Sequence, residues 1–70
     1  MENFLKRMIT ESDDLMGKIK KAEKALTNDS LHLDKTQETL LASQIEGMKE
    51  YQKYLNARIG YEKKLAGIND

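Results

Sequence analysis

Two long stretches of helical periodicity, separated by one short break, constrain the fold of this 70-residue chain more than any other feature. In the first stretch, apolar side chains recur in steps of three and four, which is the spacing of one face of an α-helix. The chain has no proline, and leucine, lysine and glutamate are abundant, which favours helix over sheet. The spacing therefore predicts a helix over about residues 3–26, with Ser12 as a polar member of an apolar stripe made of Leu5, Met8, Ile9, Leu15, Met16, Ile19, Ala22 and Leu26.

The periodicity stops between residues 27 and 34. A Thr-Asn-Asp-Ser run occurs there, and such side chains compete with the helix for backbone hydrogen bonds. Asp34 is followed three residues later by Gln37, which is the spacing of a capping box at the start of a helix. Leu31 and Leu33 stand beside this helix start, so we expect them to fold back over the end of the core.

The second periodic stretch predicts a helix over about residues 35–66, ended by Gly67. Its greater length predicts that its last turns, with Tyr61 and Leu65, extend beyond the first helix. In a heptad description of this helix, two positions form the seam that faces the partner helix. The first is occupied by Leu41, Met48 and Leu55, and the second by Gln44, Tyr51 and Arg58. A neighbouring row widens the stripe and consists of Ile45, Gln52 and Ile59.

A short connection makes two successive helices antiparallel neighbours. The chain is therefore predicted to be all-α, an antiparallel two-helix hairpin forming a single domain over residues 1–70. One layer of two helices covers only one face of each helix, and a core this small barely offsets the conformational entropy lost on folding. We therefore expect the hairpin to assemble into a helical oligomer.

Several kinds of site lack their usual residues. Without cysteine, the chain has no disulfide and no thiolate metal ligand, and His32 is its single histidine. The acidic group Glu11, Asp13 and Asp14 lacks the spacing of a calcium loop, and no glycine-rich phosphate loop or nucleophile elbow occurs. We expect no enzymatic activity, no metal and no cofactor.

The charge and hydropathy patterns narrow the partners and the compartment. Twelve basic and twelve acidic residues balance, and each half of the chain is itself neutral, which argues against DNA binding. No apolar run approaches the roughly 18 residues of a membrane span, and no secretory signal pattern is seen. The expected location is therefore the cytoplasm.

The pattern resembles small phage-encoded helical-hairpin proteins, which include the cyclic-nucleotide sponges that defeat the bacterial CBASS defence. The resemblance spans about residues 4–60. It is carried by Asp14-Leu15-Met16-Gly17-Lys18-Ile19-Lys20 in the first helix, and by Leu40-Leu41, Gln44, Gly47-Met48, Tyr51, Leu55 and Arg58-Ile59 in the second.

This resemblance implies a non-enzymatic protein that sequesters a cyclic oligonucleotide in the host cytoplasm, in pockets between the protomers of a hexamer. In those sponges, a lysine at the position matching Lys20 contacts the ligand phosphates, and an aromatic residue ahead of the first long helix stacks on a base. Lys20 is present here, whereas the aromatic position falls at Leu5, beside Phe4. The stacking contact, and with it the choice of ligand, is therefore left open.

The residues themselves offer two candidate groups. Lys20 and Lys24 are four residues apart, so they share one helix face and together can hold a phosphate. Apart from the resemblance, a solvated face near a helix C-terminus is the simpler explanation of these lysines. Tyr54, Arg58 and Tyr61 also share one face, where they suit either base stacking or a subunit interface. The candidate ligand-binding residues are thus Lys20, Lys24, Arg58, Tyr54, Tyr61 and Phe4.

An alternative function is a helical inhibitor or coiled-coil adaptor that binds a host protein. Such a protein would present an apolar stripe, for example Met8, Met16 and Met48, to a partner helix.

Overall fold

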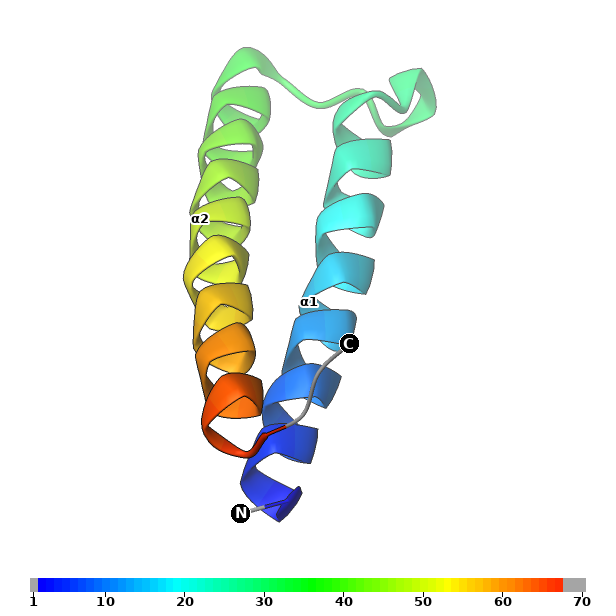
Figure 1. Ribbon diagram of the computed structural model, residues 1–70. Coiled ribbons are helices and arrows are strands. Elements are labelled where there is room, and N and C mark those ends of the chain that lie inside the picture. The colour runs from blue at the N-terminus through cyan, green and yellow to red at the C-terminus, as the bar shows by residue number, and fades with distance from the viewer. Residues whose placement is uncertain (1, 68–70) are drawn as a thin grey trace.

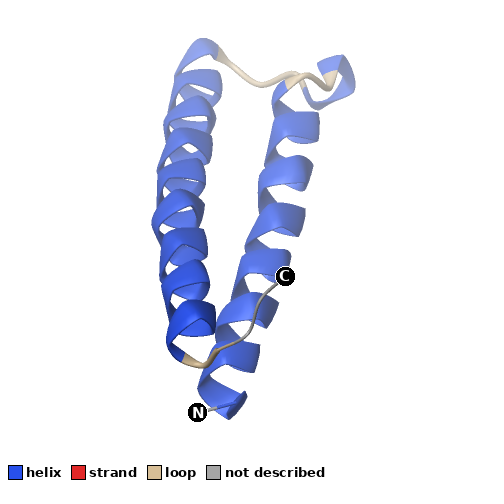
Figure 2. Cartoon of the chain, in the orientation of Figure 1, coloured by secondary structure: helices blue, strands red, loops and turns tan. Residues whose placement is uncertain are grey.

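The computed structural model describes residues 2–67 as two long helices that run antiparallel, side by side (Figures 1 and 2). Helix α1 spans Glu2–Leu26, a short 3-10 turn, η1, spans Asp29–Leu31, and helix α2 spans Lys35–Leu65. No strand occurs within the described residues. The predicted all-α antiparallel hairpin is confirmed, and both helices begin and end within one residue of the expected positions.

Local interactions set both ends of α2, through side chains at its start and through backbone conformation at its end. The Asp34 carboxylate accepts a hydrogen bond from the Gln37 backbone N–H at 2.7 Å, and the Gln37 side chain accepts one from the Asp34 N–H at 2.8 Å. This is the predicted capping box. At the other end Gly67 adopts a φ of 75°, the left-handed conformation that commonly terminates helices.

The connection does not cover the core as predicted. Leu31 is half exposed and Leu33 is only partly buried, so the expectation is wrong for Leu31. The reason is that the hydrogen bonds of η1 are made within the turn. The Asn28 side chain accepts hydrogen bonds from the backbone and the hydroxyl of Ser30, so the turn satisfies its own polar groups and leaves Leu31 in solvent.

The core is a single seam between the helices. It contains one contiguous cluster, in which Met8 packs with Leu55 and Ile59 while Leu5 and Ile9 cover its margin. Among the side chains that the structure describes, the buried apolar ones are Met8, Leu15 and Ile19 from α1, and Ile45, Leu55 and Ile59 from α2.

The expected second seam position of α2 is wrong. Gln44, Tyr51 and Arg58 are all exposed. The buried Ile45 and Ile59 take the place facing α1, because each follows a residue of the first seam position, Leu41 or Leu55, by four residues and so continues that heptad seam on the side that contacts α1.

Ser12 is the one buried polar residue of the described chain. Its hydroxyl donates a hydrogen bond to the Asn56 side-chain oxygen at 2.6 Å, and its backbone carbonyl accepts one from the Gln52 amide at 3.3 Å. A polar group inside an apolar seam is satisfied in only one alignment of the helices, so these bonds fix the register of the hairpin.

The predicted overhang at the end of α2 is also wrong. Met8 contacts Ile59, and six residues separate each of them from its own helix end, at Glu2 and Leu65. The two ends therefore finish at similar heights, and the blue start of α1 reaches at least as far as the red end of α2 in Figure 1. The additional residues of α2 lie at the end of the hairpin that carries the connection.

Candidate functional site

Two cross-helix contacts mark the two edges of the seam. On one edge, which we call the tyrosine edge, the Tyr51 hydroxyl donates a hydrogen bond to the Glu11 carboxylate. On the other, which we call the lysine edge, Lys49 and Glu23 form an ion pair at 2.8 Å. Lys49 and Tyr51 emerge on opposite sides of α2, because two residues correspond to a rotation of about 200°.

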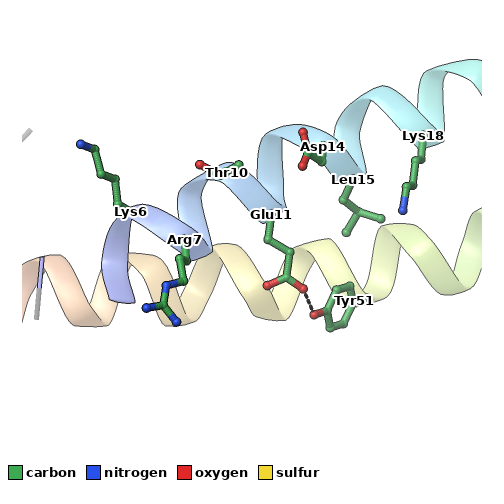
Figure 3. A pocket seen from close by; sticks show the side chains of 8 residues that line it. All are labelled: Lys6, Arg7, Thr10, Glu11, Asp14, Leu15, Lys18 and Tyr51. Atoms are coloured by element: carbon green, nitrogen blue, oxygen red, sulfur yellow. Dashed lines mark hydrogen bonds between the residues drawn. The ribbon is translucent and has the colours of Figure 1, made fainter. Parts of the chain in front are cut away.

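The tyrosine edge carries an open groove of about 540 Å³. Figure 3 shows Tyr51 from α2 meeting Glu11 from α1 in this groove, with Arg7 and Lys18 to either side. The hydrogen bond to the Glu11 carboxylate raises the pKa of Tyr51, and the positive charge of Arg58 opposes that shift. The groove is lined by Lys6, Arg7, Thr10, Glu11, Asp14, Leu15, Lys18 and Tyr51.

The charges of this groove nearly cancel. Lys6, Arg7 and Lys18 are opposed by Glu11 and Asp14. Arg7 and Lys18 are eleven residues apart, or about 16 Å along the helix. The groove therefore presents two separated cations with an acidic centre, which is a poor arrangement for one compact phosphate.

The lysine edge carries a shallower hollow of about 370 Å³, where Lys20 and Lys24 lie with Glu23 and Thr27. The hydrogen bond and charge of Glu23 raise the pKa of Lys49. Because this ion pair occupies the Glu23 carboxylate, Lys20 and Lys24 are left as the dominant charges of the hollow. No aromatic side chain lines it.

The predicted aromatic group lies on the outer face of α2. Tyr54 and Tyr61 are 56% and 61% exposed, and the Lys53 ammonium lies 5.3 Å from the centre of the Tyr54 ring. Arg58 shares their face, and it follows Tyr51 by seven residues on α2, so it lies toward the tyrosine edge.

Phe4 lies in the first turn of α1 and is 44% exposed. Its neighbour Leu5 packs against the core cluster. Of these two residues, Phe4 is therefore the one whose side chain can reach a ligand.

The hairpin does not bring the lysines and the aromatic group together. Ser12 contacts Asn56, and from that level Lys20 is eight residues toward the connection while Arg58 is two residues the other way. They are separated by about 15 Å along the axis and lie toward opposite edges.

The sequence reasoning missed the groove on the tyrosine edge, although one signal was present. Glu11 comes four residues after Arg7 and seven before Lys18, which places all three on one face of a helix. That Tyr51 faces them from α2 follows only from the packing of the hairpin.

Neither a membrane-spanning helix nor a metal-binding cluster occurs within the described residues. No helix within residues 2–67 combines the length and the apolar character needed to span a bilayer. No group of three histidine or acidic side chains in that range is arranged to hold a metal ion.

Comparison with models of protein families assigns most of the chain to a family. The model of the Sequestin family matches residues 2–61. Neither the curated proteins nor the solved structures include a significant match to the chain.

Proposed function

This chain belongs to the Sequestin family, and on that premise we propose that it sequesters a cyclic oligonucleotide signal in pockets formed between copies of itself. The family match over residues 2–61 is the observation that carries the proposal. Sequestration requires affinity alone, so the protein needs a pocket and no reacting side chains. In this role it acts as a phage counter-defence protein in the host cytoplasm.

The phosphates of the ligand bind at Lys20 and Lys24. These two ammonium groups are one turn apart on the lysine edge, and the acidic residue beside them is engaged by Lys49. Lysine binds phosphate as a point charge, and the local excess of positive charge outweighs the neutral total of the chain.

The rest of the pocket comes from a second copy. The hollow at Lys20 is shallow and has no aromatic lining, whereas Tyr54, Arg58, Tyr61 and Phe4 all lie elsewhere on the hairpin. A single chain therefore holds the phosphate-binding and base-stacking groups apart, and only another copy can supply the stacking side chain and the guanidinium. Hexameric assembly, with a pocket at each repeat of one interface, satisfies this requirement.

The adaptor alternative has less support. Its apolar stripe included Met8, which is 4% exposed and part of the core, while Met16 is 44% exposed. The three methionines are therefore not available together to a partner helix.

The deciding experiment is calorimetry with a panel of cyclic di- and trinucleotides on three proteins: wild type, Lys20→Ala and Lys18→Ala. Lys18 is the matched control, because it is the same residue type two positions away and lies on the tyrosine edge. Loss of the Lys20 contact should weaken binding by more than tenfold, corresponding to roughly 1.5–3 kcal/mol, while Lys18→Ala stays near wild type.

Light scattering on the same samples shows whether each variant keeps its subunit number. Absence of heat with every ligand would refute the proposal, and equal affinity of wild type and Lys20→Ala would refute the site. A selective loss in Lys18→Ala would move the site to the groove at Tyr51.

A further inference from the structure

The outer face of α2 carries a second stripe that α1 does not cover. Leu40, Gly47, Tyr54 and Tyr61 are spaced seven residues apart, so they form one line along the helix. The three large side chains of this line are each more than half exposed. The line thus has the heptad spacing of a helix–helix seam without a partner in the hairpin.

Gly47 and Tyr54 form a hole and a knob on this line. A β-carbon at Gly47 would meet no atom within 4 Å, and a hollow of about 570 Å³ lies above it between Ser43, Glu46 and Lys53. Tyr54 projects from the same line about 10 Å farther along the helix.

We infer that the α2 helices of two copies pack antiparallel, with Tyr54 of each copy seated over Gly47 of the other. A two-fold axis midway between the two positions makes both contacts at once, and the same register sets each Leu40 opposite the other copy's Tyr61. A parallel pair in register would instead place tyrosine against tyrosine and leave both holes empty.

The flanking charges fit the same register. Lys53 of one copy comes level with position 48 of the other, between that copy's Glu46 and Glu50, and each acid thereby gains a cation across the interface. Glu50 also faces the Glu50 of the other copy near the axis, and this like charge is one position away in height, closer than Lys53 at two positions. The arrangement therefore predicts that Glu50→Gln strengthens association, a gain that general destabilisation of the hairpin cannot produce.

This inference rests on the proposed function in one respect, namely that the ligand pocket needs a second copy. The antiparallel arrangement brings the end of one copy that carries Phe4 and Tyr61 level with the Lys24 end of the other. Of the two roles open to Tyr54, it selects the subunit interface.

The first test is sedimentation equilibrium of the ligand-free protein between about 5 and 500 µM. Gly47→Leu fills the hole and should weaken association at least tenfold, while the better helix propensity of leucine keeps the hairpin folded. Gly17→Leu is the matched control: it is a helical glycine with equally open space around it, but it lies on α1 and so outside the proposed interface, and it should associate as wild type does. Unchanged association of Gly47→Leu, or a protein that stays monomeric throughout the range, would overturn the inference.

The second test reads the direction of packing by cross-linking, which the absence of native cysteine makes clean. Ser43→Cys and Ala57→Cys lie at nearly the same height in the antiparallel pair. A disulfide should therefore form when the two variants are mixed and not within either variant alone. Self-linking of Ser43→Cys would indicate parallel packing and refute the arrangement.

Both tests are made without nucleotide. Self-association that fails while Lys20-dependent binding persists refutes this interface alone, whereas an intact interface without nucleotide binding refutes the proposed function alone.

Discussion

At the scale of single residues, the hydrogen bond between Tyr51 and Glu11 couples the folding of the hairpin to high pH. The bond raises the pKa of Tyr51 in the folded protein. Its contribution to stability is therefore fully present below the ordinary tyrosine pKa of about 10, and it disappears as the pH rises through the raised value.

Removal of this bond should be visible as a shift in tyrosine ionisation. In an absorbance titration at alkaline pH, the hydrogen bond should delay the ionisation of Tyr51, and Glu11→Ala should shift this late transition back toward the ordinary tyrosine pKa. Tyr51→Phe identifies the late transition by deleting it. If the late transition survived in Tyr51→Phe, the assignment to Tyr51 would be wrong.

Ser12 and Asn56 form the other residue-scale pair whose energy can be measured. Ser12→Ala removes a largely buried hydroxyl and should lower the free energy of unfolding by about 0.5–1.5 kcal/mol in urea denaturation followed by circular dichroism. Asn56→Ala should cost a similar amount. Because both variants delete the same bond, the double variant should be less destabilised than the sum of the singles, and strict additivity would exclude the bond.

At the scale of secondary-structure elements, the capping box is the main local signal that starts α2. Asp34→Ala removes the acceptor for the Gln37 N–H and should destabilise the hairpin by about 1 kcal/mol in the same assay. Asp29→Ala is the control, because it removes an acidic residue of the connection whose side chain caps neither long helix. Equal losses from both variants would mean that the effect is one of charge and not of capping.

The elements were predictable because their causes are local. Helix bounds follow from the spacing of apolar residues, the start of α2 from Asp34 and Gln37, and its end from Gly67. The orientation of α2 was less accessible. Two rows of residues lie side by side on the surface of α2: Gln44 and Tyr51 belong to one, and Ile45 and Ile59 to the other. Only the contact with α1 determines that the second row is buried.

The candidate site was only partly predictable for a related reason. Lys18 and Lys20 differ by two positions in sequence, yet they reach opposite edges of the hairpin. Which edge also carries Tyr51 depends on the direction in which the connection returns the chain. No residue pattern in either helix specifies that direction.

At the scale of the whole molecule, the small core makes each buried side chain decisive. Leu55 is 2% exposed and lies at the centre of the cluster. Leu55→Ala should lower the free energy of unfolding by about 2–5 kcal/mol, which approaches the total of roughly 4–10 kcal/mol expected for a chain of this length. Urea denaturation followed by circular dichroism should therefore show a much lower unfolding midpoint for Leu55→Ala than for the wild type.

Leu40 provides the matched comparison for this prediction. It is 65% exposed, so Leu40→Ala should change the stability of the dilute hairpin by no more than about 0.5 kcal/mol. In concentrated protein the same substitution should reduce association, since Leu40 belongs to the outer stripe of α2. A large loss of helicity in dilute Leu40→Ala would show that this side chain stabilises the hairpin itself.

The described chain forms a rod of about 49 × 18 × 16 Å in which each helix has a single neighbour. Every backbone amide is thus within one helix diameter of bulk water. In an isolated hairpin, amide hydrogen exchange therefore reports only the fraying of helix ends or the unfolding of the whole hairpin. If deuterium uptake slows along α2 but not along the outer side of α1, the slowed segment marks the surface that a bound molecule or a second copy covers. In so thin a protein, protection from exchange measures the assembly directly.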